Sequence, residues 1–88
     1  MSKVCVVTGA GGVLCASFAE EMARNGYKVA LLDLNEQAAQ KYADEIGENA
    51  IAVKCNCLDK ASIEEAKKTI NAKFGAVNFL INGAGGNN

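Results

Sequence analysis

Short apolar runs alternate with helix-like patterns along this chain, and glycine or a capping residue separates them. A continuous apolar run indicates a strand that is buried on both faces, because neither face needs polar side chains. The predicted strands are residues 4–7, 29–32, 50–53 and 79–81.

Between these runs, apolar residues recur every three or four positions, which is typical of amphipathic helices. Each pattern stops near a glycine, a common helix terminator, and the last two follow a residue that can cap a helix. The terminators are Gly26, Gly47 and Gly75, and the caps are Asn35 and Asp59. The order β-α-β-α-β-α-β predicts an α/β fold with parallel strands joined by right-handed crossovers.

The turn "TGAGG" at residues 8–12 links the first predicted strand to the first helix. In an open parallel sheet, ligands bind beyond the carboxyl ends of the strands, where this turn lies. Glycines let a phosphate approach the backbone, and the helix offers N–H groups and its positive dipole end. The alternative is a purely structural tight turn. The predicted pyrophosphate-binding residues are Gly9, Gly11, Gly12, Val13 and Leu14.

Asp33 ends the second apolar run, at about the spacing where a dinucleotide-binding turn has its acid. We expect its carboxylate to accept hydrogen bonds from an adenosine ribose; the alternative is a solvated turn residue. A carboxylate there repels a 2′-phosphate; no arginine or lysine directly follows Asp33, and none lies in the glycine turn. NAD is therefore favoured over NADP.

Four segments together resemble the N-terminal half of a short-chain dehydrogenase/reductase. They are "TGAGGVLC", Asp33 after the second strand, "CNCLD" after the third and "NGAG" after the fourth. The resemblance implies a partial Rossmann-like sheet with strand order 3-2-1-4, residues 1–88 being the N-terminal part of a dinucleotide-binding domain. It also implies a parent activity of hydride transfer between NAD and an alcohol or carbonyl compound. The last segment is further similar to oxidoreductases that act on mannonate or fructuronate.

The same resemblance implies cofactor contacts beyond the glycine turn. Position 56 stands where the family usually has an acid near the adenine, so its asparagine removes a charged acceptor. Cys15 stands at the third glycine of the family turn, and we expect it to pack as a small side chain rather than react. The further implied contacts are Asn56, Cys57, Asn82, Gly83, Ala84 and Gly85.

The catalytic groups that the resemblance implies are not found in these 88 residues. The family uses a tyrosine with a lysine four positions later and a serine nearby, but Leu31 follows Tyr27 and Ile46 follows Tyr42. No catalytic residue is predicted, and the serines of the predicted helices, Ser17 and Ser62, are expected at the helix surface. Three hypotheses remain: the NAD-binding portion of an oxidoreductase, a non-catalytic nucleotide-binding module, or an inactive truncated fragment.

The amino-acid composition of the chain argues against nucleic acid and membranes as partners. The chain has 88 residues, half of them hydrophobic, and a net charge of −1, which is typical of one small globular domain. It lacks the basic patch that attracts nucleic acid and the apolar run of about 20 residues that spans a bilayer. Without a signal-peptide pattern, we expect a cytoplasmic protein.

The four cysteines are not expected to form a metal site, because the chain has no histidine and the only close pair is Cys55 with Cys57. Cys5 lies inside an apolar run and is predicted to be a small buried hydrophobe.

The third helix alone would cover one face of the predicted sheet, and the fourth strand would form an apolar edge. Such edges pair readily with another chain, so we expect either self-association or pairing through the exposed sheet face and this edge, or a chain that is a fragment of a longer protein. The apolar stripe of the third helix is Ile63, Ala66, Ile70 and Phe74.

Overall fold

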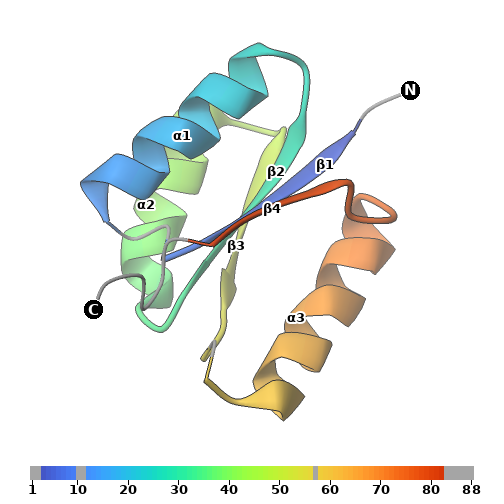
Figure 1. Ribbon diagram of the computed structural model, residues 1–88. Helices are drawn as coiled ribbons and strands as arrows, with labels where there is room; N and C mark the ends of the chain where they lie inside the picture. The colour runs from blue at the N-terminus through green and yellow to red at the C-terminus, as the bar shows by residue number, and fades with distance from the viewer. Residues whose placement is uncertain (1–2, 10–11, 57, 83–88) are drawn as a thin grey trace.

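The computed structural model describes residues 3–9, 12–56 and 58–82 (Figure 1). In this part of the chain, strands and helices alternate in the predicted order. The elements are β1 (Val4–Thr8), α1 (Val13–Arg24), β2 (Lys28–Asp33), α2 (Glu36–Ile46), β3 (Ala50–Lys54), α3 (Lys60–Lys73) and β4 (Phe79–Asn82). The strands are slightly longer than the apolar runs because backbone pairing continues onto polar residues at their ends.

The described strands form one parallel sheet with the order β3-β2-β1-β4, which confirms the predicted α/β topology. The chain moves outward from β1 to β3 and then returns to the other side of β1 for β4. The direction of winding therefore reverses at β1. In sheets of this kind the ligand crevice lies at the reversal, beyond the carboxyl ends of the strands.

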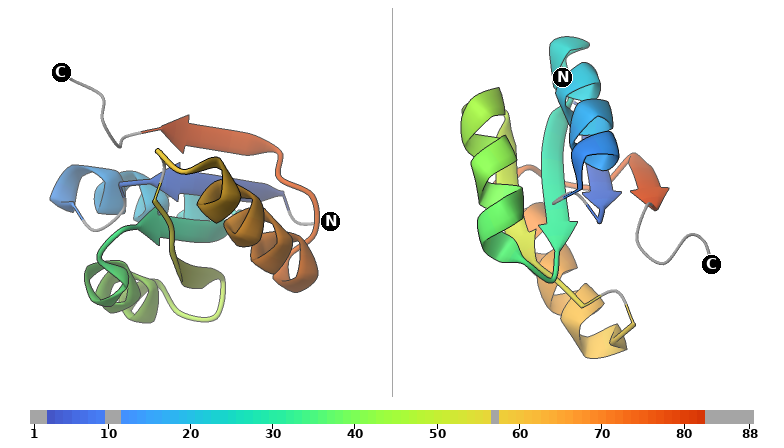
Figure 2. Two further views of the ribbon diagram at one scale, coloured as in Figure 1. Left: turned by 90° about the horizontal axis from the view of Figure 1, so that it is seen from below. Right: turned by 90° about the vertical axis from the view of Figure 1, so that its left-hand side faces the viewer.

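The two faces of the sheet are covered unequally (Figure 2). Helices α1 and α2 pack on one face, where their alanines allow close approach to the strands. Helix α3 packs on the other, as right-handed crossovers require once the winding reverses. A hydrophobic cluster of buried residues lies on each face of the sheet. The cluster under α1 and α2 contains Cys5, Val7, Ala19, Val29, Leu31, Ala39 and Ala43. The cluster under α3 contains Val4, Val6, Ala30, Leu32, Cys55, Ala66 and Ile70.

Both predicted helix caps are confirmed. The Asn35 side chain accepts a hydrogen bond from the Ala38 N–H at 3.1 Å, and the Asp59 side chain accepts one from the Ala61 N–H at 3.1 Å. These bonds satisfy N–H groups that have no partner within a helix, and they set where α2 and α3 begin.

The cysteines of the core act as small apolar groups. Cys5 is completely buried in β1, and this burial raises the pKa of its thiol, which favours the protonated form. Cys15 is half-buried and packs against the cluster beneath α1, in line with the packing role expected for it. Cys5, Cys15 and Cys55 are free thiols.

Candidate dinucleotide-binding site

The glycine turn begins directly at the carboxyl end of β1. Gly9 has a φ of 70°. This left-handed backbone conformation is unfavourable for residues that carry a side chain, and glycine adopts it readily. The Gly12 N–H donates to the Gly9 carbonyl at 3.2 Å, which closes the turn. Ala10 and the predicted site residue Gly11 lie outside the described residues. The chain thus needs a glycine at position 9 to leave the central strand and enter α1.

The first turn of α1 is open. Gly12 is the N-cap of α1, and the structure of the described residues shows no capping hydrogen bond from a side chain at this helix end. The first turn of α1 also contains no acidic residue. The first helical bond runs from the Ala16 N–H to the Gly12 carbonyl at 3.0 Å, so the amides of Val13 and Leu14 precede it. Both side chains are 74% exposed. This helix end differs from α2 and α3, whose N-termini are capped, and it can accept an anion.

Asp33 lies at the same edge of the sheet, on the strand next to the glycine turn. Thr8 at the end of β1 pairs with Leu32, so Asp33 stands one position beyond that pair. One of its carboxylate oxygens accepts the Asn35 N–H at 2.9 Å, which orients the half-buried side chain at the strand end. The structure therefore brings the predicted phosphate and ribose positions together.

The end of β3 continues this edge. The Cys55 N–H donates to the Asp33 carbonyl at 3.0 Å, which sets Asn56 beside Asp33. The Asn56 N–H donates to the Ser62 hydroxyl at 2.8 Å, and the Asn56 side-chain oxygen accepts the Leu58 N–H at 3.0 Å. Cys57 lies outside the described residues.

The expectation that Ser62 belongs to the helix surface is wrong. Its hydroxyl turns toward the β3 end and accepts the Asn56 N–H. The position of Ser62 three residues after the capping Asp59 places it in the first turn of α3, where a hydroxyl can reach the preceding loop. The spacing of three residues from Asp59 could have predicted this contact from the sequence. Ser17 agrees with the expectation, because its hydroxyl donates to the Val13 carbonyl of its own exposed helix surface at 3.1 Å.

The last predicted segment follows β4. Asn82 ends that strand and pairs with Thr8, so it reaches the same edge. The Thr8 hydroxyl donates to the Ile81 carbonyl at 3.4 Å and links β4 to the central strand. The remaining predicted contacts, Gly83, Ala84 and Gly85, lie outside the described residues.

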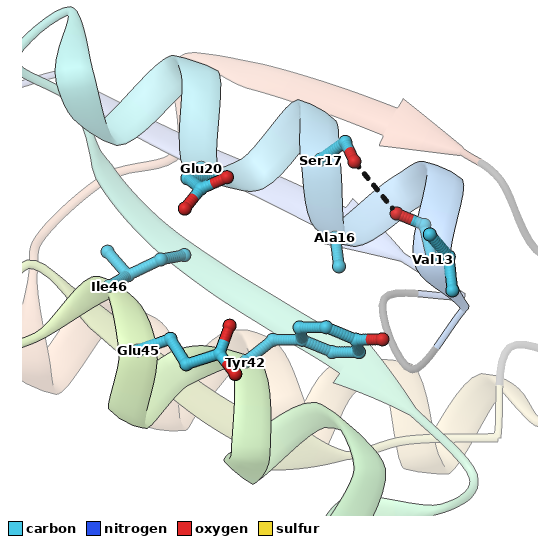
Figure 3. Close-up of a pocket in the computed structure, with 7 residues that line it drawn as sticks. All are labelled: Val13, Ala16, Ser17, Glu20, Tyr42, Glu45 and Ile46. Atoms are coloured by element: carbon cyan, nitrogen blue, oxygen red, sulfur yellow. Dashed lines mark hydrogen bonds between the residues drawn. The ribbon is translucent and has the colours of Figure 1, made fainter.

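A small cavity of about 80 Å³ lies between α1 and α2 (Figure 3). Its volume is well below the roughly 300 Å³ of small-molecule sites. Its lining comes from both helices: Val13, Ala16, Ser17, Glu20, Tyr42, Glu45 and Ile46.

A larger cavity of about 570 Å³ lies between α3 and the half-covered face of the sheet. Val6 and Thr8 of β1 and Leu80 of β4 contribute to one wall, and Ile63 and Ile70 of α3 contribute to another. The cavity exists because one helix does not fill this face.

Residues 3–9, 12–56 and 58–82 hold neither a metal cluster nor a membrane-spanning helix. They contain no group of three or more metal-binding side chains close enough to share an ion. None of their helices combines the length and apolarity that crossing a membrane requires.

A parallel sheet that reverses at its central strand, with a glycine turn leading into an open helix end, defines a Rossmann-like α/β fold. The family model described as short chain dehydrogenase matches residues 3–88. The chain belongs to this family.

Relatives of this chain are oxidoreductases. It is 49% identical over 88 residues to the uncharacterised oxidoreductase UxuB of Bacillus subtilis, covering 97% of this chain and 32% of UxuB. The structure of a proposed D-mannonate oxidoreductase from Haemophilus influenza with bound NAD matches with a TM-score of 0.91 and 48% identity, over 98% of this chain and 32% of that one. A 3-ketoacyl-(acyl-carrier-protein) reductase from Brucella melitensis complexed with NADH matches with a TM-score of 0.86 and 35% identity, over 89% and 32%. The chain thus spans about a third of the length of these proteins.

Proposed function

We propose that residues 1–88 are the N-terminal part of a dinucleotide-binding domain that binds NAD. The observation that carries the proposal is the arrangement of the open α1 terminus and the Asp33 carboxylate on adjacent strand ends of one sheet edge. A diphosphate on the helix end then has its sugar directed toward the carboxylate. The positive dipole end stabilises the diphosphate, and the carboxylate accepts from the ribose hydroxyls.

Each predicted residue has a role in this proposal. The glycine turn and the first amides of α1 bind the pyrophosphate, Asp33 binds the ribose, the β3 end borders the base, and the β4 end borders the remainder of the cofactor. The proposed cofactor-binding residues are Gly9, Gly11, Gly12, Val13, Leu14, Asp33, Asn56, Cys57, Asn82, Gly83, Ala84 and Gly85.

NAD rather than NADP is the proposed cofactor. Asp33 ends β2 and is followed by Leu34, so a 2′-phosphate would meet a negative charge without a basic partner beside it. The bound NAD and NADH of the two structural relatives support this choice.

We further propose that the longer protein to which these residues correspond transfers hydride between NAD and an alcohol or carbonyl compound. The relation to a proposed D-mannonate oxidoreductase supports a sugar acid as substrate. The chain itself supplies the cofactor site and no Tyr-x-x-x-Lys pair, so it binds without turnover. We also propose that the protein is cytoplasmic.

Calorimetric titration of the 88-residue chain with NAD tests the proposal. We expect saturable one-to-one binding, weaker binding of NADP, and no change in NADH absorbance when mannonate or fructuronate is added. Turnover by the chain would contradict the assignment of a binding part without catalytic groups. Absence of NAD binding by a folded chain would leave the inactive fragment as the better hypothesis.

The 88-residue chain is also proposed to form dimers through β4. This edge strand exposes 46% of Phe79 and 64% of Leu80 beside the half-filled face. The proposed occupant is a second copy of the chain, because two identical edge strands can pair antiparallel about a two-fold axis and bury both apolar edges.

Replacing Leu80 by lysine is expected to convert the dimer to a monomer, since the charge would lie in the interface. Sedimentation velocity measures the change. Leu58→Lys is the matched control, because Leu58 is 95% exposed and lies outside β4. A wild-type chain that sediments as a monomer would refute the proposed dimer, as would equal dissociation by both variants.

A further inference from the structure

The larger cavity, between α3 and the half-covered face of the sheet, lies apart from the proposed NAD site. None of the described residues assigned to NAD lines it. Its volume of about 570 Å³ lies within the roughly 300–1,000 Å³ of small-molecule sites, which are lined mainly by apolar side chains with a few polar groups. The cavity therefore has the size of a second ligand site.

The walls of this cavity are mostly apolar. Val6 of β1 and Leu80 of β4 line it on the side of the sheet, and Ile63 and Ile70 line it on the side of α3. Ile63 is 42% exposed and Leu80 is 64% exposed, so a ligand in the cavity would remove their apolar surface from water. That removal is favourable in proportion to the apolar area covered. The walls therefore favour a ligand with an apolar body.

Lys67 brings one positive charge to the cavity. Ile63, Lys67 and Asn71 follow one another at intervals of four residues and so lie on one face of α3. Among the described residues that line the cavity, Lys67 is the only charged one. In the part of the chain that the structure describes, no carboxylate forms an ion pair with its ammonium. The lysine stem can lie along the apolar wall while the ammonium stays in water.

We infer that this cavity binds a medium-chain fatty carboxylate, with its apolar chain between α3 and the sheet and its carboxylate at Lys67. The ammonium offsets a single negative charge, and the Asn71 side-chain amide, one helical turn further on, can donate to a carboxylate oxygen. A phosphate monoester would bring a second negative charge that no described lining residue offsets. The dimer proposed through β4 pairs strands in the plane of the sheet, whereas this cavity lies on its face.

Calorimetric titration of the 88-residue chain with octanoate and with octylamine tests this inference, because the two ligands have similar apolar chains and opposite charges. We expect the wild-type chain to bind octanoate about fivefold more tightly than octylamine, as for one ion pair that is partly screened by solvent. Lys67→Met removes the charge and keeps a long, unbranched apolar side chain. Most of the preference for octanoate should therefore be lost in this variant.

Lys68→Met is the matched control. Lys68 is the next residue of α3, is exposed and does not line the cavity, so its replacement should leave the preference for octanoate unchanged. A wild-type chain that binds no octanoate, or binds octylamine as tightly, overturns the inference even if Lys67→Met fails to fold. An equal preference in the two variants also overturns it. A second copy of the chain in the cavity would weaken octanoate binding as the chain concentration rises, and that result would overturn it as well.

Discussion

Replacing Leu31 by alanine is expected to leave most of the chain unfolded. Leu31 is completely buried in the middle of β2, where it pairs with Val7 on one side and Ala52 on the other. It belongs to the cluster that joins the sheet to α1 and α2. Truncating a buried leucine costs about 2–5 kcal/mol, which includes the cavity left behind.

This loss is large for the chain because the total stability of a domain is only about 0.05–0.15 kcal/mol per residue. The half-filled face between α3 and the sheet places the chain toward the lower end of that range. Urea unfolding followed by circular dichroism measures the difference. Leu34→Ala is the matched control, because Leu34 is 61% exposed and its truncation should change stability by less than about 0.5 kcal/mol. Equal losses for the two variants would contradict the assignment of Leu31 to the core.

Replacing Asp33 by asparagine is expected to weaken NAD binding by about ten- to a hundredfold, the effect of losing a hydrogen bond to a charged group. Asparagine can still accept the Asn35 N–H through its oxygen, so the strand end should keep its conformation. The second oxygen becomes an amide nitrogen and cannot accept from the ribose. The same change removes the negative charge that opposes a 2′-phosphate.

The affinity for NADP should therefore rise relative to that for NAD, and titration of both cofactors measures the ratio. Asp44→Asn is the control for the change of charge, because Asp44 is exposed on α2 and accepts from the Gln40 side chain. An unchanged ratio in Asp33→Asn would show that the carboxylate does not contact the ribose.

Much of the fold could be predicted from local patterns. The apolar run in β1 predicted a strand buried on both faces, and the structure has Val4–Thr8 buried throughout. The caps at Asn35 and Asp59 could be predicted because a cap and its N–H partner lie within the same few residues. The apolar stripe of α3 was less informative. Ile70 is buried, but Ile63 is 42% exposed because it lines the larger cavity rather than contacting the sheet fully.

The candidate site could be predicted only in part. Gly9 and Asp33 were identified because each lies next to an apolar run whose end must reach the same edge of a parallel sheet. The role of Ser62 was missed, since its partner Asn56 lies before α3 and the contact depends on how that helix is placed.

The sequence by itself determined the order of elements, the helix caps and the turn that needs glycine at position 9, because these features depend on neighbouring residues. Only the tertiary structure decided which distant groups meet. The Thr8 hydroxyl donates to Ile81, and the Asn78 side chain accepts the Val4 N–H, across more than 70 residues of chain. Such contacts depend on strand register and on the winding reversal at β1. The reversal was expected only from the family resemblance, and local composition does not encode the register, because the register comes from packing the whole sheet.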